Sequence, residues 1–368
     1  MTDSREARPR VVFAFNGQMW DDVSTPDNLA RLGTLFDYET AISDVPSGWT
    51  EPPKRAPEVT ERLVGLARGA SAIVVSHGSP LVDGELLARV PGVRFVGELE
   101  GDRFASRIDV EACVERGVRV VDTNNFCSPP VAEWALAMML MGLRNYGFLF
   151  RRAVHEHRLD RPADWIDNVG YRNAELTGKT VGLIGFGHIG RHLMKLMAPF
   201  ETKVYAYDPY VPPELGEVFG VTFTSLDQVM SRSDVVVCLV PLTPRTEGMV
   251  GSEQVDLMKD GAVFVNVARG KVVDNAALIR RARLGELIVC LDVNDPEPLH
   301  SDSPLFDIPT VILSPHIAGV VAAGRPRTLS LMIDELERHF AGHEPWFSIL
   351  PRTLANRYGR PVPQVATT

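Results

Sequence analysis

The stretch VGLIGFGHIG, residues 181–190, decides the fold because its glycines fall at the spacing G-x-G-x-x-G after a strand-like run. The run before it, TVGLI, is apolar and β-branched, and HIGRHLMKLMAPF after it has the apolar spacing of an amphipathic helix. In this context Gly185 makes a tight turn, Gly187 lets a pyrophosphate approach the backbone, and Gly190 lets helix and strand pack closely. The pattern therefore predicts a dinucleotide-binding turn, with an ordinary glycine-rich turn as the alternative.

The next strand-like run, KVYAYD, ends in Asp208, which lies 208 − 190 = 18 residues after Gly190. An acidic residue about 20 residues beyond the motif is the one that binds the ribose hydroxyls of a dinucleotide. A carboxylate at this place accepts a hydrogen bond from a 2′-hydroxyl and repels a 2′-phosphate, and the following Pro209 carries no positive charge. The sequence thus favours NAD over NADP as cofactor.

Length and composition indicate a soluble protein of about two domains, since 368 residues with 45% hydrophobic and 23% charged residues is ordinary globular composition. The net charge of −9 includes no long basic run, which makes a nucleic-acid partner improbable. The charged start and the short apolar run after it predict neither a signal peptide nor a membrane partner, and we expect a cytoplasmic protein. Four scattered cysteines without a CxxC pair predict no disulfide and no zinc, and we expect no metal site.

Short β-branched runs alternate with helix-length segments along most of the chain, a pattern typical of an α/β fold with parallel sheets. Four such runs precede a long apolar helix at 128–145, and six follow it. The amphipathic segment 328–344 is expected to return to the first domain, the alternative being that it ends the second. Strand-like runs are RVVFAF, SAIVVS, VRFVG and VRVVD in the first half, and TVGLIGF, KVYAYD, DVVVCLVP, AVFVNVA, LIVCLDV and TVILSPH in the second.

Three predicted strands of the second half end in segments that carry chemically active side chains. VNVARG contains Arg269, LDVNDPEP contains Glu297, and LSPHIAG contains His316. Ligands of open α/β sheets collect beyond the carboxyl ends of the strands, so these segments are expected to converge on one site. Each residue also has a structural interpretation, as a solvated strand end, a turn residue or a loop histidine.

With the glycine turn and Asp208, these motifs resemble the family of NAD-dependent D-2-hydroxyacid dehydrogenases over residues 70 to 340, and CLVPLTPRT and ELTGKTVGLIGFGHIG match that family as well. The resemblance implies that Arg269 binds the substrate carboxylate, that His316 is the general acid/base at the C2 oxygen, and that Glu297 holds the other ring nitrogen. It also implies cofactor contacts from Gly185, Gly187, His188, Ile189, Gly190, Asp208, Pro241, Thr243 and Asp292.

The resemblance implies two doubly wound parallel-sheet domains, with a Rossmann domain inserted into a smaller flavodoxin-like substrate domain. We expect the substrate domain to comprise 1–125 and 325–350 and the NAD-binding domain to comprise 126–324. The proline-punctuated tail 351–368 is expected to be irregular.

The chain departs from the family pattern in the first domain. Where relatives carry a short stretch like G-x-G-x-D-N-I-D, this sequence has the longer and more charged VGELEGDRFASRIDVEA, 96–112. Substrate contacts are expected from His77 and Gly78 of SHGSP and from Arg103, which is suited to a second acidic group. Solvated loop positions are the alternative for these residues.

The helix at 128–145 is more apolar than one buried face requires, and in the family the corresponding segment forms a two-fold dimer, so we expect a homodimer. Burial within the monomer is the alternative. The expected activity is hydride transfer between NAD(H) and a small 2-hydroxy acid/2-oxo acid pair. Two rival functions remain: an NAD(H)-sensing interaction protein of the co-repressor type, and a phosphoglycerate-type dehydrogenase.

Overall fold

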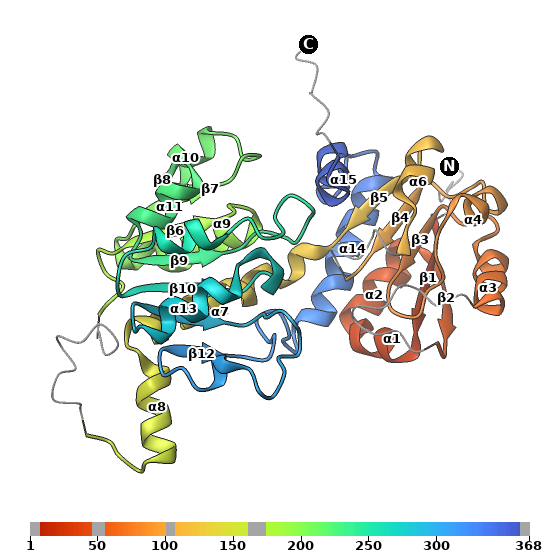
Figure 1. Cartoon of the computed structure of the whole chain (residues 1–368). Coiled ribbons are helices and arrows are strands. Elements are labelled where there is room, and N and C mark those ends of the chain that lie inside the picture. Colours follow the sequence, from red (N-terminus) through yellow and green to blue (C-terminus); the bar gives the residue numbers. More distant parts are fainter. Residues whose placement is uncertain (1–7, 46–55, 101–106, 161–173, 361–368) are drawn as a thin grey trace. The chain divides into compact units, whose positions relative to one another are not determined.

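The structure, a computed structural model, describes residues 8–45, 56–100, 107–160 and 174–360. The chain divides into two compact units (Figure 1), of which the first is Met1–Phe126 with Ala322–Thr368 and the second is Cys127–Val321. Each unit is built on a fully parallel sheet covered by helices on both faces. This is the α/β class of two doubly wound parallel sheets expected from the sequence.

The first unit holds a five-stranded sheet in the order β2-β1-β3-β4-β5, which is the flavodoxin-like order. Helices α3, α4 and α6 cover one face, and α1, α2 and α14 cover the other. The helix α14 lies beyond the second unit in sequence, yet it packs on the first sheet beside β4. The elements are β1 (Arg10–Asn16), α1 (Gly17–Val23), α2 (Pro26–Leu35), β2 (Asp37–Ser43), α3 (Pro57–Ala67), β3 (Ala72–Val75), α4 (Gly84–Arg89), β4 (Phe95–Glu98), α6 (Val110–Glu115), β5 (Arg119–Asp122) and α14 (Gly324–Phe340).

The C-terminal segment extends this unit instead of forming an irregular tail throughout. Ser348 pairs antiparallel with Val121 of β5, and the Ile349 N–H donates to the Val120 carbonyl at 2.9 Å. Helix α15 (Pro351–Arg357) follows, so the expectation of an irregular segment from residue 351 is wrong for these seven residues. Apolar contacts of Ile349 with the core of the unit hold the segment in place, which local sequence does not reveal.

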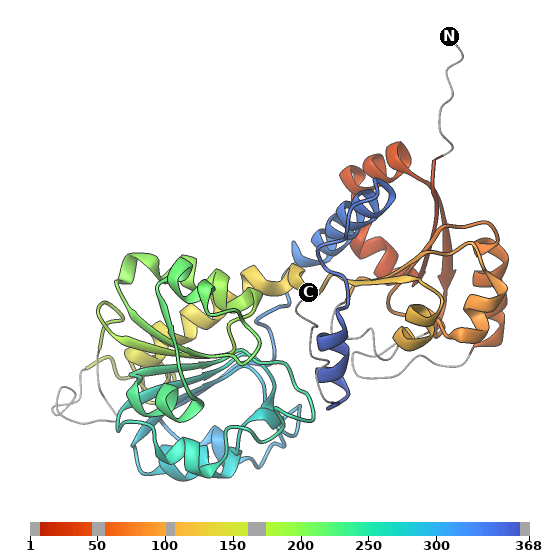
Figure 2. The same cartoon turned by 90° about the horizontal axis from the view of Figure 1, so that it is seen from above.

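The second unit holds a seven-stranded sheet in the order β12-β11-β10-β9-β6-β7-β8. Figure 2 shows helices on both sides of this sheet. Helices α7 and α9 cover one face, and α11, α12 and α13 cover the other. The elements are α7 (Ser128–Leu143), α8 (Tyr146–His155), β6 (Thr180–Ile184), α9 (His188–Met197), β7 (Lys203–Tyr207), α10 (Glu214–Phe219), β8 (Val221–Phe223), α11 (Leu226–Arg232), β9 (Val235–Cys238), α12 (Ser252–Asp256), β10 (Ala262–Asn266), α13 (Asn275–Arg283), β11 (Leu287–Leu291) and β12 (Val311–Leu313).

The stretch Asn125–Leu143, mainly helix α7, has a mean hydropathy of 1.3 and is, by length and composition alone, long and apolar enough to span a membrane. Half of it is buried inside the second unit, where α7 packs against α9, β10 and β11. Ala132, Ala135, Met138 and Met139 are fully buried. The apolar composition of α7 is thus explained in large part by core packing.

Candidate active site

The glycine turn joins β6 to α9 at the point where the strand order of the second sheet reverses, which is where open α/β sheets bind ligands. Gly185 has φ +96, and an added Cβ would lie 2.9 Å from Val240 Cγ1. At Gly190 an added Cβ would lie 3.3 Å from the Gly185 carbonyl oxygen, which allows the helix to pack closely on the turn. At Gly187, by contrast, an added Cβ meets no atom within 4 Å. The three glycines therefore have three different physical roles.

Asp208 follows β7, the strand next to β6, and its carboxylate contacts the glycine turn directly. Its Oδ2 accepts from the Phe186 N–H at 2.9 Å and its Oδ1 from the Tyr210 N–H at 2.9 Å. These bonds fix the carboxylate at the carboxyl edge of the sheet. At this position the Asp208 carboxylate is suited to accept hydrogen bonds from the ribose hydroxyls of a dinucleotide.

A dinucleotide fits this arrangement. The first N–H groups of α9 have no acceptor inside the helix, and the open space beside Gly187 leaves room for a pyrophosphate at the positive end of the helix. His188 is the first residue of α9, and burial lowers the pKa of its imidazole, with Arg191 and His192 adding to the effect. A bound anion beside His188 would act against this shift.

Pro241 and Thr243 lie in the segment after β9, the strand on the other side of β6. Thr246 Oγ1 organises this segment, because it donates to the Pro241 carbonyl at 2.6 Å and accepts from the Thr243 N–H at 2.8 Å. The glycine turn, Asp208 and this segment thus follow three adjacent strands.

Three further neighbouring strands, β10, β11 and β12, carry the other active side chains at the same edge of the sheet. Arg269 follows β10, Asp292 follows β11 and His316 follows β12, and these strands are neighbours in the sheet. His316 Nδ1 hydrogen-bonds Glu297 Oε1, and both side chains are partly exposed, at 35% and 38%. The structure therefore brings together the histidine and carboxylate that the sequence singled out. The outer nitrogen, Nε2, remains the one suited to a substrate.

Asp292 is buried and holds the loop that carries His316. Its Oδ1 accepts from the Ile317 N–H at 3.0 Å and from the Ser314 hydroxyl, and its Oδ2 accepts from the Ala318 N–H at 3.0 Å. The His316 N–H donates to the Asp292 carbonyl at 2.9 Å, and His316 adopts a left-handed backbone with φ +54. Asp292 thus orients the histidine through the backbone of its loop.

Arg269 is half-buried, and its Nη1 donates to the Ala268 carbonyl at 2.6 Å. The buried Asn266 fixes the backbone around it by donating to the Arg269 carbonyl at 3.1 Å and accepting from the Ala268 N–H at 3.0 Å. Gly270 comes next, and a Cβ there would lie 2.1 Å from the carbonyl carbon and oxygen of Asn294. The Arg269 and Glu297 segments can approach each other only because residue 270 lacks a side chain.

In the first unit, His77 and Gly78 lie in the turn after β3, at the carboxyl edge of its sheet. Gly78 is buried with φ +82, and its N–H has no hydrogen-bond partner among the residues that the structure describes. His77 is buried in a network with Glu100 and Arg107. Arg103 lies outside the described residues.

Sequence reasoning missed Asn266, Gly270 and the network around His77. The signal for Gly270 was present, since a glycine follows Arg269 directly, but the approaching backbone of Asn294 is 24 residues away in sequence (294 − 270 = 24). Within the described ranges, no group of three His, Cys, Asp or Glu side chains is placed to hold a metal. The described cysteines form no disulfide, and burial raises the pKa of Cys113, Cys238 and Cys290 to about 12.

Comparison with known proteins agrees with this geometry. Residues 136–318 match the model for "D-isomer specific 2-hydroxyacid dehydrogenase, NAD binding domain". A hydroxypyruvate reductase of Blautia hydrogenotrophica is 32% identical over 316 residues, covering 85% of this chain and 91% of that protein. A D-3-phosphoglycerate dehydrogenase of Mycobacterium tuberculosis is 31% identical over 322 residues, which is 87% of this chain but only 56% of that protein.

Among solved structures, a phosphoglycerate oxidoreductase from Rhizobium etli superimposes with a TM-score of 0.76, covering 93% of this chain and 98% of that one. At 24% identity this likeness shows the fold alone. The match to the reductase covers nearly the whole of both proteins at more than 30% identity. The chain belongs to the D-isomer specific 2-hydroxyacid dehydrogenase family, the NAD-dependent oxidoreductases that interconvert 2-hydroxy and 2-oxo acids.

Proposed function

We propose that Arg269, Glu297 and His316 reduce a small 2-oxo acid at the expense of NADH, and that the second unit binds the cofactor while the first selects the acid. The observation that carries this proposal is the His316–Glu297 pair at the same sheet edge as the glycine turn. In an open α/β sheet, one edge brings a cofactor and an acid/base pair within reach of one substrate.

Each residue has a defined task in the reduction. NADH supplies the hydride that adds to C2. The Arg269 guanidinium, always charged and able to make paired bonds, holds the substrate carboxylate and polarises the C2 oxygen. His316 gives its Nε2 proton to that oxygen, and Glu297 accepts from Nδ1–H and stabilises the ring while it is charged. Oxidation of the hydroxy acid runs the same steps in reverse.

Further contacts complete the proposed site. A carboxylate has about four lone-pair positions on its two oxygens. Three protein donors occupy three of these positions on Asp292, so one is left for the carboxamide of the nicotinamide. His188, Ile189, Pro241 and Thr243 would line the bound cofactor. In the first unit, the N–H of Gly78 would donate to the substrate carboxylate, with His77 next to it.

The direct test follows NADH oxidation with a panel of 2-oxo acids: glyoxylate, hydroxypyruvate, pyruvate, a dicarboxylic oxo acid and 3-phosphohydroxypyruvate. We expect turnover with NADH and much weaker turnover with NADPH, because Asp208 repels a 2′-phosphate. Hydroxypyruvate is the first candidate, because the match to the hydroxypyruvate reductase covers 91% of that protein. Asp208→Ser should narrow the gap between NADH and NADPH.

Several outcomes would contradict this function. Tight NADH binding without turnover of any acid would favour the rival sensing role, which the relatives do not support. Turnover of only the phosphorylated acid would favour the phosphoglycerate-type alternative, whose relatives are about twice as long as the matched region. An unchanged cofactor preference in Asp208→Ser would contradict the ribose assignment.

We further propose a homodimer that forms through helix α8. Tyr146, Leu149, Phe150 and Val154 lie at helical spacing and are 39–51% exposed, forming one apolar stripe. Arg151, on the same helix, fixes α8 to the second unit by donating to the carbonyls of residues 306, 308 and 311. Such a stripe on an anchored helix suits a second copy placed by a two-fold axis.

Light scattering should give a mass near 81 kDa, twice the 40.6 kDa of the chain. The double variant Phe150→Asp with Val154→Asp should give the monomer mass, because it puts charges in the centre of the stripe. Val218→Asp, at a 73% exposed position of α10, is the matched control and should remain dimeric. A monomeric wild type would exclude the dimer.

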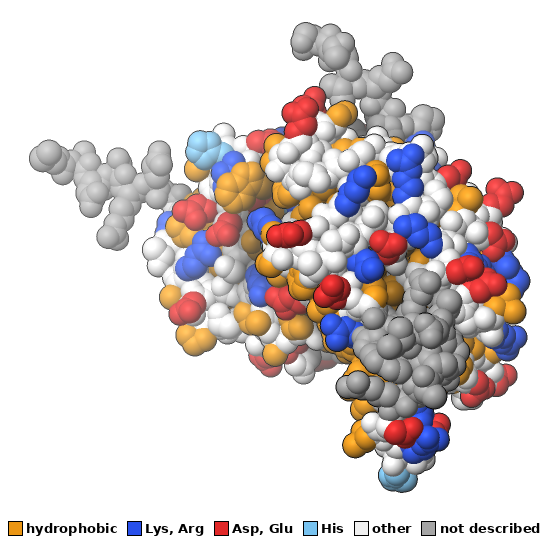
Figure 3. Space-filling model, turned by 90° about the vertical axis from the view of Figure 1, so that its left-hand side faces the viewer, with side chains coloured by type: hydrophobic (Ala, Val, Ile, Leu, Met, Phe, Trp, Pro, Cys, Tyr) orange, Lys and Arg blue, Asp and Glu red, His pale blue; other side chains and the backbone are white. Residues whose placement is uncertain are grey.

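We also propose that the enzyme acts in the cytoplasm without a nucleic-acid or membrane partner. On the face of the second unit seen in Figure 3, Lys and Arg side chains are interspersed with Asp and Glu and form no continuous basic area. The buried free thiols suit a reducing compartment.

A further inference from the structure

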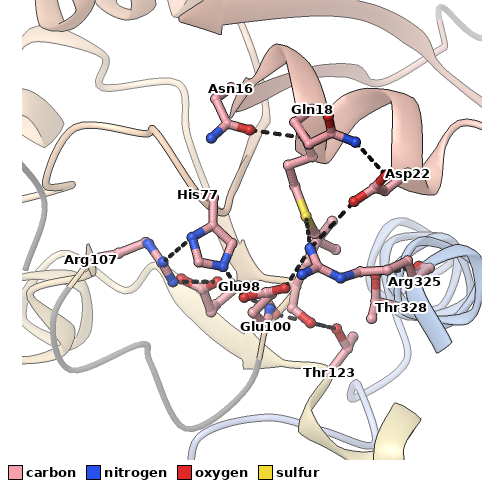
Figure 4. A network of polar contacts seen from close by, with 12 residues as sticks. Asn16, Gln18, Asp22, His77, Glu98, Glu100, Arg107, Thr123, Arg325 and Thr328 are labelled. Atoms are coloured by element: carbon pink, nitrogen blue, oxygen red, sulfur yellow. Dashed lines mark hydrogen bonds and ion pairs between the residues drawn. The ribbon is translucent and has the colours of Figure 1, made fainter. Parts of the chain in front are cut away.

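A chain of buried charged side chains follows the carboxyl edge of the first sheet (Figure 4). His77 comes from the turn after β3, Glu98 is the last residue of β4, Glu100 lies two residues later, and Arg107 precedes α6. The side chains of Glu98, Glu100, Arg107 and His77 are 0%, 1%, 2% and 7% exposed. We call these four residues the edge network.

The edge network is continuous and directional. Arg107 Nη1 donates to Glu98 Oε1 at 3.2 Å, and Arg107 Nη2 lies 3.4 Å from His77 Nδ1. His77 Nε2 contacts Glu100 Oε2. Since an arginine only donates, Nδ1 is the acceptor and Nε2–H donates to Glu100. Arg107 therefore links the end of β4 to the turn after β3.

The same turn is tied to Arg107 by the backbone. The Val82 N–H donates to the Arg107 carbonyl at 2.8 Å, and the Asp109 N–H donates to the Val82 carbonyl at 2.9 Å. Side chain and backbone of Arg107 thus bracket the segment 76–82. Gly78, whose N–H has no partner within the described ranges of the chain, lies inside this segment.

The charges of the edge network are compensated unevenly. Burial raises the pKa of Glu98, whose Oε2 has no hydrogen-bond partner among the described residues. Burial also acts to raise the pKa of Glu100, but the hydrogen bond with His77 and the charges of Arg325 and Arg107 outweigh it and lower that pKa. Arg325, from the first turn of α14, lies 2.8 Å from Glu100 Oε1 and closes the chain at this end.

Such a network is a poor device for stability alone, because the desolvation of buried charges offsets most of their attraction, and apolar side chains of similar volume often replace them without loss. Directional bonds do something that apolar packing cannot, since they fix the orientation of the backbone that they join. They occur here at the sheet edge where ligands bind.

We propose that the edge network, centred on Arg107, positions the turn after β3 so that the Gly78 N–H points at the substrate carboxylate. This inference rests on the proposed reduction of 2-oxo acids. Arg107 and His77 are positioning residues in this assignment, and the donor that touches the substrate is the Gly78 N–H. Because every 2-oxo acid has the carboxylate, the network governs affinity for the whole class equally.

The test compares the wild type with a double variant that carries both Arg107→Met and Glu98→Gln. This variant removes the cation together with the carboxylate that it pairs with, so neither of the two buried charges is left without its partner. Arg107→Lys is the conservative variant, keeping the charge without the two-pronged geometry. Arg89→Met, which breaks the exposed pair of Arg89 with Glu61 in the same unit, is the matched control. We would measure kcat and KM for glyoxylate, pyruvate and hydroxypyruvate, the inhibition constant of oxamate, the NADH Kd and the Tm.

In the double variant we expect KM for all three acids and the oxamate constant to rise by about tenfold or more, since a hydrogen bond to a charged group is lost. The kcat and the NADH Kd should stay within about threefold, because cofactor and acid/base pair belong to the other unit. Arg107→Lys should lie between wild type and the double variant, and Arg89→Met should behave like wild type.

Unchanged KM values in a folded double variant would overturn the inference, as would a rise confined to hydroxypyruvate, which would place the network beside the substrate side chain. A rise of both KM and the NADH Kd together with a lowered Tm would mean that the substitutions destabilise the whole protein, and this result would also overturn the inference. If the double variant does not fold, Arg107→Lys decides in the same way. A wild type that reduces none of the acids would instead reject the proposed function itself.

Discussion

Replacing His316 with alanine should lower kcat for 2-oxo acid reduction by about 10²–10⁴-fold, the range for loss of a positioned general acid. The NADH Kd should stay near the wild-type value, because the glycine turn and Asp208 follow other strands of the sheet. Glu297→Gln should have a smaller effect, since the amide still accepts from Nδ1–H but no longer stabilises the charged ring. Stopped-flow NADH oxidation under single-turnover conditions measures the chemical step directly.

The matched control is His343→Ala, at an exposed histidine outside the site, which should leave kcat unchanged. A His316→Ala enzyme with near-normal turnover would remove the histidine from the mechanism. Equal losses of kcat and NADH affinity would mean a disturbed second unit, so both must be measured on the same preparations.

Gly270→Ala should abolish most activity although residue 270 carries no functional group. Its Cβ would lie 2.1 Å from the Asn294 carbonyl and 2.6 Å from the Asp295 nitrogen, and neither backbone atom can rotate away. The methyl group would push the Glu297 segment away from Arg269. A displacement of about 1 Å in a catalytic site can cost on the order of 10²-fold in rate, and overpacking costs about 1–3 kcal/mol of stability.

We would measure kcat/KM and the Tm of Gly270→Ala beside Gly65→Ala, because a Cβ at Gly65 in α3 meets nothing within 4 Å. The control should be active and no less stable than wild type. A Gly270→Ala enzyme with normal kcat/KM would show that the two segments need not approach as closely as they do here.

The fold class could be predicted from the sequence because its signals are local. The glycine spacing, Asp208 and the strand-like runs each depend on neighbouring residues, and β6, β7 and the other buried strands follow them. The elements that were missed lack that local signal. β2 has mostly half-buried side chains at the sheet edge and β8 has three residues, so neither has a clear apolar run.

That Glu297 and His316 lie at one site could be predicted because both follow adjacent strand ends, and their contact was implied by the resemblance to the dehydrogenase family. The edge network could not be anticipated in the same way. Glu98 and Arg107 look like charged residues of a solvated loop in the sequence, but in the fold their side chains are buried against each other. Gly270 depends likewise on a backbone that reaches it from another strand. Local patterns identify chemical groups, whereas long-range packing decides which of them meet.

The backbone of His316 has a consequence for evolution. A left-handed conformation costs a non-glycine residue on the order of 1–3 kcal/mol, and glycine would adopt φ +54 at almost no cost. The chain therefore retains a less stable residue at 316 for the sake of its imidazole, an instance of the trade-off between stability and activity. The substitution His316→Gly would therefore relieve the backbone cost and remove the imidazole in one step.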